Sequence, residues 1–183
     1  MKRFTVEEYD QMIRDGTIDG EPLELLDGWI VEKMPKNAPH DSAISRLNKR
    51  LNRLLGEEFL VRIQSSAVVD TSMPEPDVAV VFGPDDEFDN RRPNPSDLLL
   101  VIEVAESSLV RDRGFKARLY GRNKIPVYWI VNLKDRVVEV HSLPRNGKNA
   151  GYRNIAIYRP GDAVPVVIGK KTVGSIPVSE ILP

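Results

Sequence analysis

The chain has no cysteine among its 183 residues. This absence excludes disulfide bonds, thiolate-bound zinc and a cysteine nucleophile. The only histidines are His40 and His141, which are too few for a histidine-rich metal site. An excess of charge of one sign is also lacking, because the formal net charge is -1. Binding to nucleic acid would therefore depend on a local basic patch rather than on the charge of the whole chain.

Long apolar segments are missing as well. The N-terminal residues 1–8 carry charge almost from the start and contain no apolar stretch typical of a signal peptide. No segment approaches the roughly 20 apolar residues that a membrane span needs. With the absence of cysteine, these features predict a soluble cytoplasmic protein without a membrane partner.

The hydrophobic pattern that is present predicts a mixed β-sheet flanked by helices, in one α/β (α+β) domain over residues 1–183. Thr5 and Glu8 form a capping-box pattern, which predicts a helix from about Val6 to Arg14. Asp27-Gly28 predicts the turn of a hairpin between two short strands. The rest of the pattern predicts a helix that ends at Gly56, a second helix at 108–122, and strands at 59–69, 78–82, 98–104, 127–132, 136–141, 152–158 and 164–168.

Two carboxylates stand within or beside apolar runs that are typical of buried strands. Asp77 opens the run Asp-Val-Ala-Val-Val, and Glu103 lies inside Leu-Leu-Leu-Val-Ile-Glu-Val-Ala. A buried carboxylate is costly unless something compensates its charge. Two carboxylates on adjacent strands can share Mg²⁺ or Mn²⁺, with the carbonyl of Val104 as a further ligand.

A lysine on the next predicted helix could complete this site. Lys116 could hold a phosphate or act on the attacking water, and Tyr120 lies four residues later, on the same side of a helix. The same residues allow simpler interpretations. Asp77 could be a turn residue after two prolines, and Lys116 could form a surface pair with Asp112 or a buried salt bridge with Glu103.

Basic residues gather in two predicted helices. They are Arg46, Lys49, Arg50 and Arg53 in the first, and Arg111, Arg113, Lys116, Arg118, Arg122 and Lys124 in or just after the second. They could contact phosphates on both sides of the site, or they could form two ordinary solvated helix faces.

An ordered set of motifs over most of the chain resembles the Uma-two family of restriction-endonuclease-like proteins, a branch of the PD-(D/E)xK nuclease superfamily. The set comprises Glu-Leu-Leu-Asp-Gly from Glu24, Met34-Pro, Pro-Glu-Pro-Asp-Val-Ala-Val-Val, Val-Ile-Glu-Val, Arg-Asp-Arg-Gly-Phe-Lys-Ala-Arg-Leu-Tyr and Ile-Pro-Val-Tyr-Trp-Ile-Val. Ala105 stands where the superfamily usually has its lysine, which is a departure from that pattern.

The resemblance implies a restriction-endonuclease-like core with a divalent-metal site at Asp77 and Glu103. Lys116 would be the displaced lysine, supplied by the following helix in this branch. Glu24 and His40 would line the same pocket, and Gln64 is similar to a polar position on the preceding strand.

These residues lead to one main hypothesis and two alternatives. The main hypothesis is an endonuclease that hydrolyses DNA with Mg²⁺ or Mn²⁺. The first alternative is a catalytically inactive nuclease-fold protein that binds DNA or a protein, because Ala105 replaces the usual lysine. The second is a structural homo-oligomer in which the acids and the lysine form only salt bridges. A homodimer is expected in addition, since relatives of this fold often pair.

Overall fold

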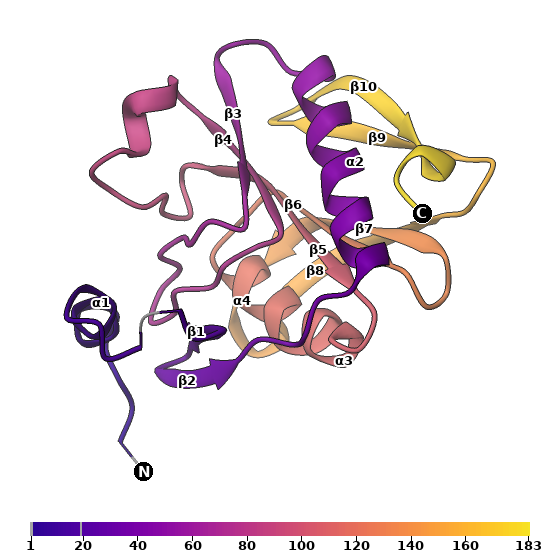
Figure 1. Cartoon of the computed structure of the whole chain (residues 1–183). Helices are drawn as coiled ribbons and strands as arrows, with labels where there is room; N and C mark the ends of the chain where they lie inside the picture. The colour runs from indigo at the N-terminus through magenta and orange to yellow at the C-terminus, as the bar shows by residue number, and fades with distance from the viewer. Residues whose placement is uncertain (1, 19) are drawn as a thin grey trace.

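A six-stranded mixed sheet forms the centre of the protein, for which a computed structural model describes residues 2–18 and 20–183. The strands lie in the order β3-β4-β5-β6-β7-β8 (Figure 1). Their bounds are β3 Phe59–Ile63, β4 Val78–Phe82, β5 Leu98–Ala105, β6 Val127–Asn132, β7 Val137–Arg145 and β8 Gly151–Tyr158. Only β5 and β6 run parallel, and the other neighbours are antiparallel. The predicted α+β class with a mixed sheet is confirmed.

Both faces of this sheet are covered. The helix α2 (Ala38–Leu54) and the hairpin of β9 (Ala163–Ile168) and β10 (Lys171–Pro177) pack on one face, and α4 (Ala117–Arg122) packs on the other (Figure 1). Alternate residues of β5 therefore enter different cores. Ile102 and Val104 face α2, whereas Val101 and Ala105 face α4. This alternation directs the side chain of Glu103 toward α4.

The N-terminal segment adds a helix and a hairpin at one end of the sheet. Helix α1 (Val6–Arg14) begins at Thr5, whose side chain completes the predicted capping box with Glu8. Strands β1 (Leu23–Leu26) and β2 (Trp29–Glu32) form the predicted hairpin. Its two turn residues both have positive φ, 48° at Asp27 and 78° at Gly28, as a tight hairpin turn requires.

Some element boundaries differ from the sequence prediction, and some elements were not predicted. Strand β3 stops at Ile63 instead of continuing to residue 69, because Gln64 adopts a left-handed conformation with φ of 45°. The chain then crosses to β4 without a regular strand. Strand β10 was not predicted, and neither were the short 3₁₀ helices η1 (Asp85–Phe88), η3 (Gly147–Asn149) and η4 (Val178–Glu180).

The predicted helix at 108–122 is not one regular helix. It consists of α3 (Leu109–Arg111), a π-helical segment η2 (Asp112–Lys116) and α4. The hydroxyl of Tyr128, from β6, donates to the carbonyl of Asp112 at 3.3 Å, and the amide of Ala117 bonds to the same carbonyl. Short π-helical segments inside helices are frequent at functional sites. Here the segment carries Lys116.

None of the helices in the described part of the chain has the length and apolar content needed to cross a bilayer.

Candidate active site

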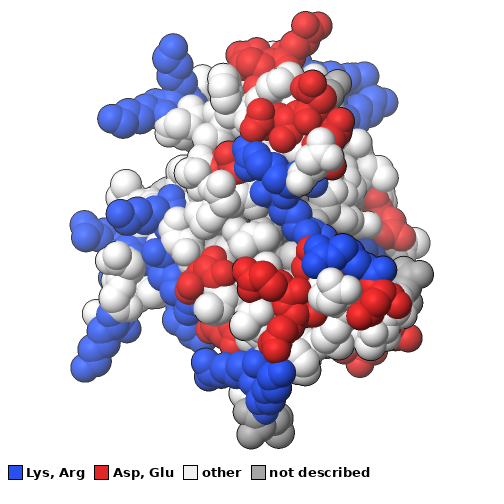
Figure 2. Space-filling model, turned by 90° about the vertical axis from the view of Figure 1, so that its left-hand side faces the viewer, with Lys and Arg blue, Asp and Glu red and all other residues white. Residues whose placement is uncertain are grey.

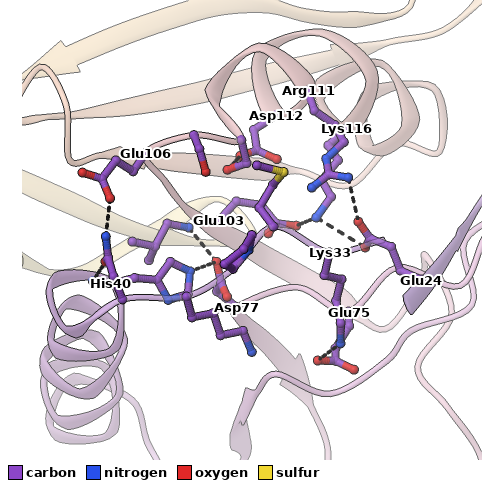
Figure 3. Close-up of a pocket in the computed structure, with 17 residues that line it drawn as sticks. Glu24, Lys33, His40, Glu75, Asp77, Glu103, Glu106, Arg111, Asp112 and Lys116 are labelled. Carbon is purple, nitrogen blue, oxygen red and sulfur yellow. Dashed lines mark hydrogen bonds and ion pairs between the residues drawn. The ribbon is translucent and has the colours of Figure 1, made fainter. Parts of the chain in front are cut away.

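A polar cavity lies where β4, β5, α2 and the π-helical segment meet (Figure 3). Four of the predicted residues line it together with Lys116: Glu24, His40, Asp77 and Glu103. The backbone of Val104 lines it as well. The tertiary structure thus brings residues from five separate segments into one cavity.

Asp77 and Glu103 are next to each other across the sheet. Val78 pairs with Ile102 at this end of the ladder between β4 and β5, and continuing the same antiparallel register by one residue brings Asp77 opposite Glu103. Residues directly opposite in an antiparallel pair have Cβ atoms about 5 Å apart. Both side chains also line the same cavity, so the two carboxylates are placed as neighbours.

The carboxylate of Asp77 is held through one of its oxygens. Oδ2 accepts the backbone N–H of Val104 at 2.8 Å and lies 3.2 Å from Nε2 of His40. Burial alone would raise the pKa of Asp77, but His40 and the Val104 amide outweigh it and lower the pKa. Burial would also lower the pKa of His40, and the interaction with Asp77 raises it instead. Oδ1 accepts no hydrogen bond from any described residue.

The carboxylate of Glu103 is also held through one oxygen. Oε1 accepts hydrogen bonds from Nζ of Lys116 at 2.9 Å and from the hydroxyl of Tyr120 at 2.8 Å. Glu103 is only 4% exposed, and its burial raises its pKa to about 8 despite the charge of Lys116. Within residues 2–18 and 20–183, no donor reaches Oε2.

Lys116 is a buried cation among carboxylates. Its Nζ lies 3.5 Å from Oε2 of Glu24 in addition to its bond with Glu103, as Figure 3 shows. Burial would lower the pKa of Lys116, but Glu103, Glu24 and Asp112 outweigh it and raise the pKa. With 5% exposure, Lys116 does not form the surface pair with Asp112 that its spacing allowed. Asp112 is itself buried and accepts the hydroxyl of Ser108 at 2.6 Å.

Gln64 is the predicted residue that the structure places elsewhere. It lines a separate recess with Arg62 and Arg92, although its backbone N–H donates to the carbonyl of Asp77 at 3.1 Å. Its left-handed backbone turns it away from the path of β3. His141, the second of the two histidines, is buried within β7, with Nε2 3.7 Å from Oε2 of Glu139.

Several lining residues were not predicted. They are Lys33, Glu75, Glu106, Arg111 and Asp112, with Lys33 and Glu75 forming an ion pair at 2.8 Å. Glu75 lies two residues before Asp77 in an extended segment, so period-two alternation would have placed it on the same side. The others lie in loops, at the end of α3 or in the π-helical segment, and no regular spacing in the sequence indicates that they share a cavity.

The donor set of the cavity suits a hard divalent cation. Six carboxyl groups line it, against four lysine or arginine side chains, so it is rich in the oxygen ligands that such a cation prefers. Oε2 of Glu24 is buried without a hydrogen-bond donor, and Asp77 and Glu103 each keep one oxygen free of hydrogen bonds from the described residues. No group of three or more acidic or histidine side chains in that part of the chain could hold an ion alone. Such an ion would need water or substrate oxygens, as is usual for Mg²⁺.

Of the basic residues in the two helices, only Arg111 and Lys116 line the cavity within the described part of the chain. On α2, Arg46 donates to the carbonyl of Leu182 and Arg50 pairs with Glu180 at 3.0 Å. In the second group, Arg113 pairs with Glu139 and Arg122 with Asp27. On a different face, the one at the left-hand side of Figure 1, acidic and basic side chains are interspersed (Figure 2). Neither group as a whole therefore supports the hypothesis that basic residues contact phosphates on both sides of the cavity.

Comparisons with known proteins agree with this fold. The family model of Uma2, described as "Putative restriction endonuclease", matches residues 6–169. The fold is similar to a crystal structure described as "a putative nuclease belonging to DUF820" from Anabaena variabilis, with a TM-score of 0.68, 12% identity and 97% of each chain covered. No curated protein matches the chain. At 12% identity, the structural similarity shows only that the two proteins share a fold. The family model matches most of the sequence and therefore shows the family. The chain belongs to the Uma2 family of restriction-endonuclease-like proteins.

Proposed function

We propose that the protein is an endonuclease that hydrolyses phosphodiester bonds of DNA with Mg²⁺ or Mn²⁺ bound by Asp77 and Glu103. The observation that carries the proposal is the contact of 2.9 Å between Nζ of Lys116 and Oε1 of Glu103. It puts a lysine from the helical segment beside the second acid, although Ala105 occupies the usual lysine position. The family description and the nuclease-like fold support the same function.

The bound cation would supply Lewis-acid stabilisation of the charge that develops on the phosphate. Asp77 would hold it through the free Oδ1, because His40 and the Val104 amide engage Oδ2. Glu103 would use Oε2, because Oε1 is engaged by Lys116 and Tyr120. The carbonyl of Val104 is a further candidate ligand. One oxygen of each carboxylate is thus kept for positioning and the other for the cation.

Lys116 would act as a cation in this site. The surrounding carboxylates raise its pKa, so it remains protonated and cannot take a proton from water. Its role would be to orient the attacking water or to stabilise negative charge on the phosphate. Glu24, which lies 3.5 Å from Nζ, would help to keep the ammonium charged and in place.

The test compares hydrolysis of plasmid and single-stranded DNA by the wild type and by Glu103→Gln, with Mg²⁺ or Mn²⁺. We expect cleavage by the wild type and a loss of at least about 100-fold in the variant, since a ligand of the cation is removed. Glu57→Gln, at an exposed position away from the cavity, is the matched control. Equal cleavage by wild type and Glu103→Gln would refute the proposal.

Metal binding measured by calorimetry separates this function from the two alternatives. Binding that is lost in Asp77→Asn, without any cleavage by the wild type, would indicate an inactive nuclease-fold binder. No binding by the wild type would favour the structural homo-oligomer. Light scattering after size exclusion tests the expected homodimer, and limited proteolysis tests the expectation of one domain over residues 1–183.

A further inference from the structure

A recess with a basic lining lies between α4 and the turn that joins β7 to β8. Its charged side chains are Arg113, Arg118, Arg145 and Lys148, and none of the acidic residues that the structure describes lines it. Arg113 is engaged by Glu139 at 2.6 Å and by Asp135 at 3.6 Å. The recess therefore differs from the candidate active site, where carboxylates outnumber cations.

The other three cations of this basic recess are free to bind a ligand. Arg118, Arg145 and Lys148 are exposed. None of them forms an ion pair or a side-chain hydrogen bond with any residue in 2–18 or 20–183. They come from two segments, α4 and the β7–β8 connection, which the fold brings together. Three unneutralised cations around one hollow are suited to an anionic ligand with more than one charge.

An apolar hollow connects the basic recess with the candidate active site. It shares Met34, Ser108 and Arg111 with the active-site cavity, and it shares Gly114 and Arg118 with the basic recess. The three hollows thus lie side by side along the segment from α3 to α4, and together we call them the path. We call the middle part the apolar saddle, and its apolar side chains are Met34, Val110 and Phe115.

The apolar saddle exposes side chains that a folded protein usually covers. Val110 is 87% exposed and Met34 is 43% exposed. Exposed apolar side chains beside free cations are suited to a polymer in which flat apolar rings alternate with negatively charged groups. Single-stranded nucleic acid has this chemistry, because its bases pack on apolar side chains and its phosphates bind cations.

The length of the path is compatible with several nucleotides. Arg111, at the cavity, and Arg118, at the basic recess, are seven residues apart along the helical segment, which corresponds to roughly 10 Å. A strand of nucleic acid advances about 3.4 Å per nucleotide in a duplex and more when it is extended. A strand cut at the cavity would therefore reach the basic recess within about three nucleotides.

We propose that this path binds one strand of the substrate beside the scissile bond, an inference that rests on the proposed nuclease function. Bases next to the scissile phosphate contact the apolar saddle, and a phosphate farther along the strand binds Arg118, Arg145 and Lys148. The substrate is then a single strand or a frayed end, because a base can lie on Val110 and Phe115 only when it is not paired inside a duplex.

The test measures binding of a fluorescent single-stranded DNA oligonucleotide by anisotropy, in EDTA so that no cleavage occurs. The path variant is Arg118→Ala/Arg145→Ala/Lys148→Ala. Its control is Lys49→Ala/Arg53→Ala/Lys171→Ala, which removes three exposed and unpaired cations that line none of the three hollows. Near 0.1 M salt, we expect the path variant to bind at least tenfold more weakly than the control. The slope of log K against the logarithm of the salt concentration should be smaller in magnitude by about 2 than in the control.

A second variant tests the apolar saddle. Val110→Glu places a negative charge on the path at a side chain that is 87% exposed, so the fold should tolerate it. Val173→Glu, on β10, is its control. We expect Val110→Glu alone to weaken binding. The inference would be overturned if each of the two variants bound the oligonucleotide as tightly as its control. It would also be overturned if the wild type did not bind the oligonucleotide.

The binding test and the cleavage test can fail separately, so failure of the path can be distinguished from failure of the nuclease function. Loss of binding in the path variant together with unchanged cleavage in Glu103→Gln would support the path and refute the proposed chemistry. Cleavage that depends on Glu103, with the path variant binding like its control, would leave the chemistry intact and refute the path. Weaker binding of the oligonucleotide than of a matched duplex would refute the preference for a single strand.

Discussion

Nζ of Lys116 lies 2.9 Å from Oε1 of Glu103, and both side chains are buried. Removing one partner of a buried ion pair leaves an uncompensated charge, whereas removing both can be nearly neutral. This relationship makes the first prediction a comparison of single and double variants.

We expect Lys116→Met to lower the free energy of unfolding by about 3 kcal/mol, because Glu103 and Glu24 lose the cation between them. The double variant Lys116→Met/Glu103→Gln should recover a large part of this loss. Urea unfolding of the wild type, both single variants and the double variant measures the coupling. Strictly additive effects would show that the two side chains do not stabilise each other.

The second prediction concerns His40, which lies 3.2 Å from the oxygen of Asp77 that the Val104 amide also engages. We expect His40→Ala to weaken Mn²⁺ binding by roughly 10-fold, because groups that orient a metal ligand have effects of this size. Calorimetry with Mn²⁺ measures the effect. His40→Gln, whose amide nitrogen can take the place of Nε2 and donate a hydrogen bond to Asp77, should retain more affinity than His40→Ala, and the opposite order would contradict a positioning role.

The third prediction is a pH dependence outside the cavity. Burial would raise the pKa of Glu139, but the neighbouring His141 and the hydrogen bonds from Arg113 and Asn132 outweigh it and lower the pKa to about 2. Since the folded-state pKa is below the unfolded value, the carboxylate stabilises the fold above about pH 4.5, and this contribution disappears as the pH falls toward 2.

Urea unfolding of the wild type and Glu139→Gln at several pH values tests this dependence. The variant should be less stable than the wild type at pH 7, and the difference should shrink between pH 5 and pH 3. A difference that stays constant over this range would mean that the charge of Glu139 does not contribute.

The fourth prediction tests the packing of α4 against β8. A Cβ atom at Gly121 would lie 2.1 Å from the carbonyl oxygen of Gly151, which is backbone and cannot rotate away. We expect Gly121→Ala to destabilise the protein by about 1–3 kcal/mol. Gly114→Ala is the matched control, because its nearest contact would be 3.9 Å away, at the side chain of Arg118. Thermal unfolding measures both, and equal melting temperatures would contradict the close packing.

Local patterns in the sequence determined a large part of the fold. The capping box at Thr5 and the turn at Asp27-Gly28 each depend on residues that are close in the chain, and both were predicted and are confirmed. Apolar runs likewise predicted β4, β5 and β6, since continuous apolar segments need burial on both faces of a sheet. The order of these elements was enough to predict the α+β class.

Patterns of this kind could not predict where regular structure is interrupted. The left-handed residue Gln64 ends β3, and the π-helical segment from Asp112 to Lys116 depends partly on a hydrogen bond from Tyr128 on another strand. Neither is encoded by periodicity, because each is a response of the backbone to its tertiary surroundings.

The sequence by itself determined that Asp77 and Glu103 would be costly carboxylates at buried strands and that Lys116 was available on the next helical segment. Only the tertiary structure decided that Lys116 is buried against Glu103 rather than exposed beside Asp112, and that Glu24 and His40 join the same cavity while Gln64 does not. The physical reason is that the register of β4 with β5 and the turn geometry of the π-helical segment set the side-chain directions. Both depend on contacts between residues far apart in the chain.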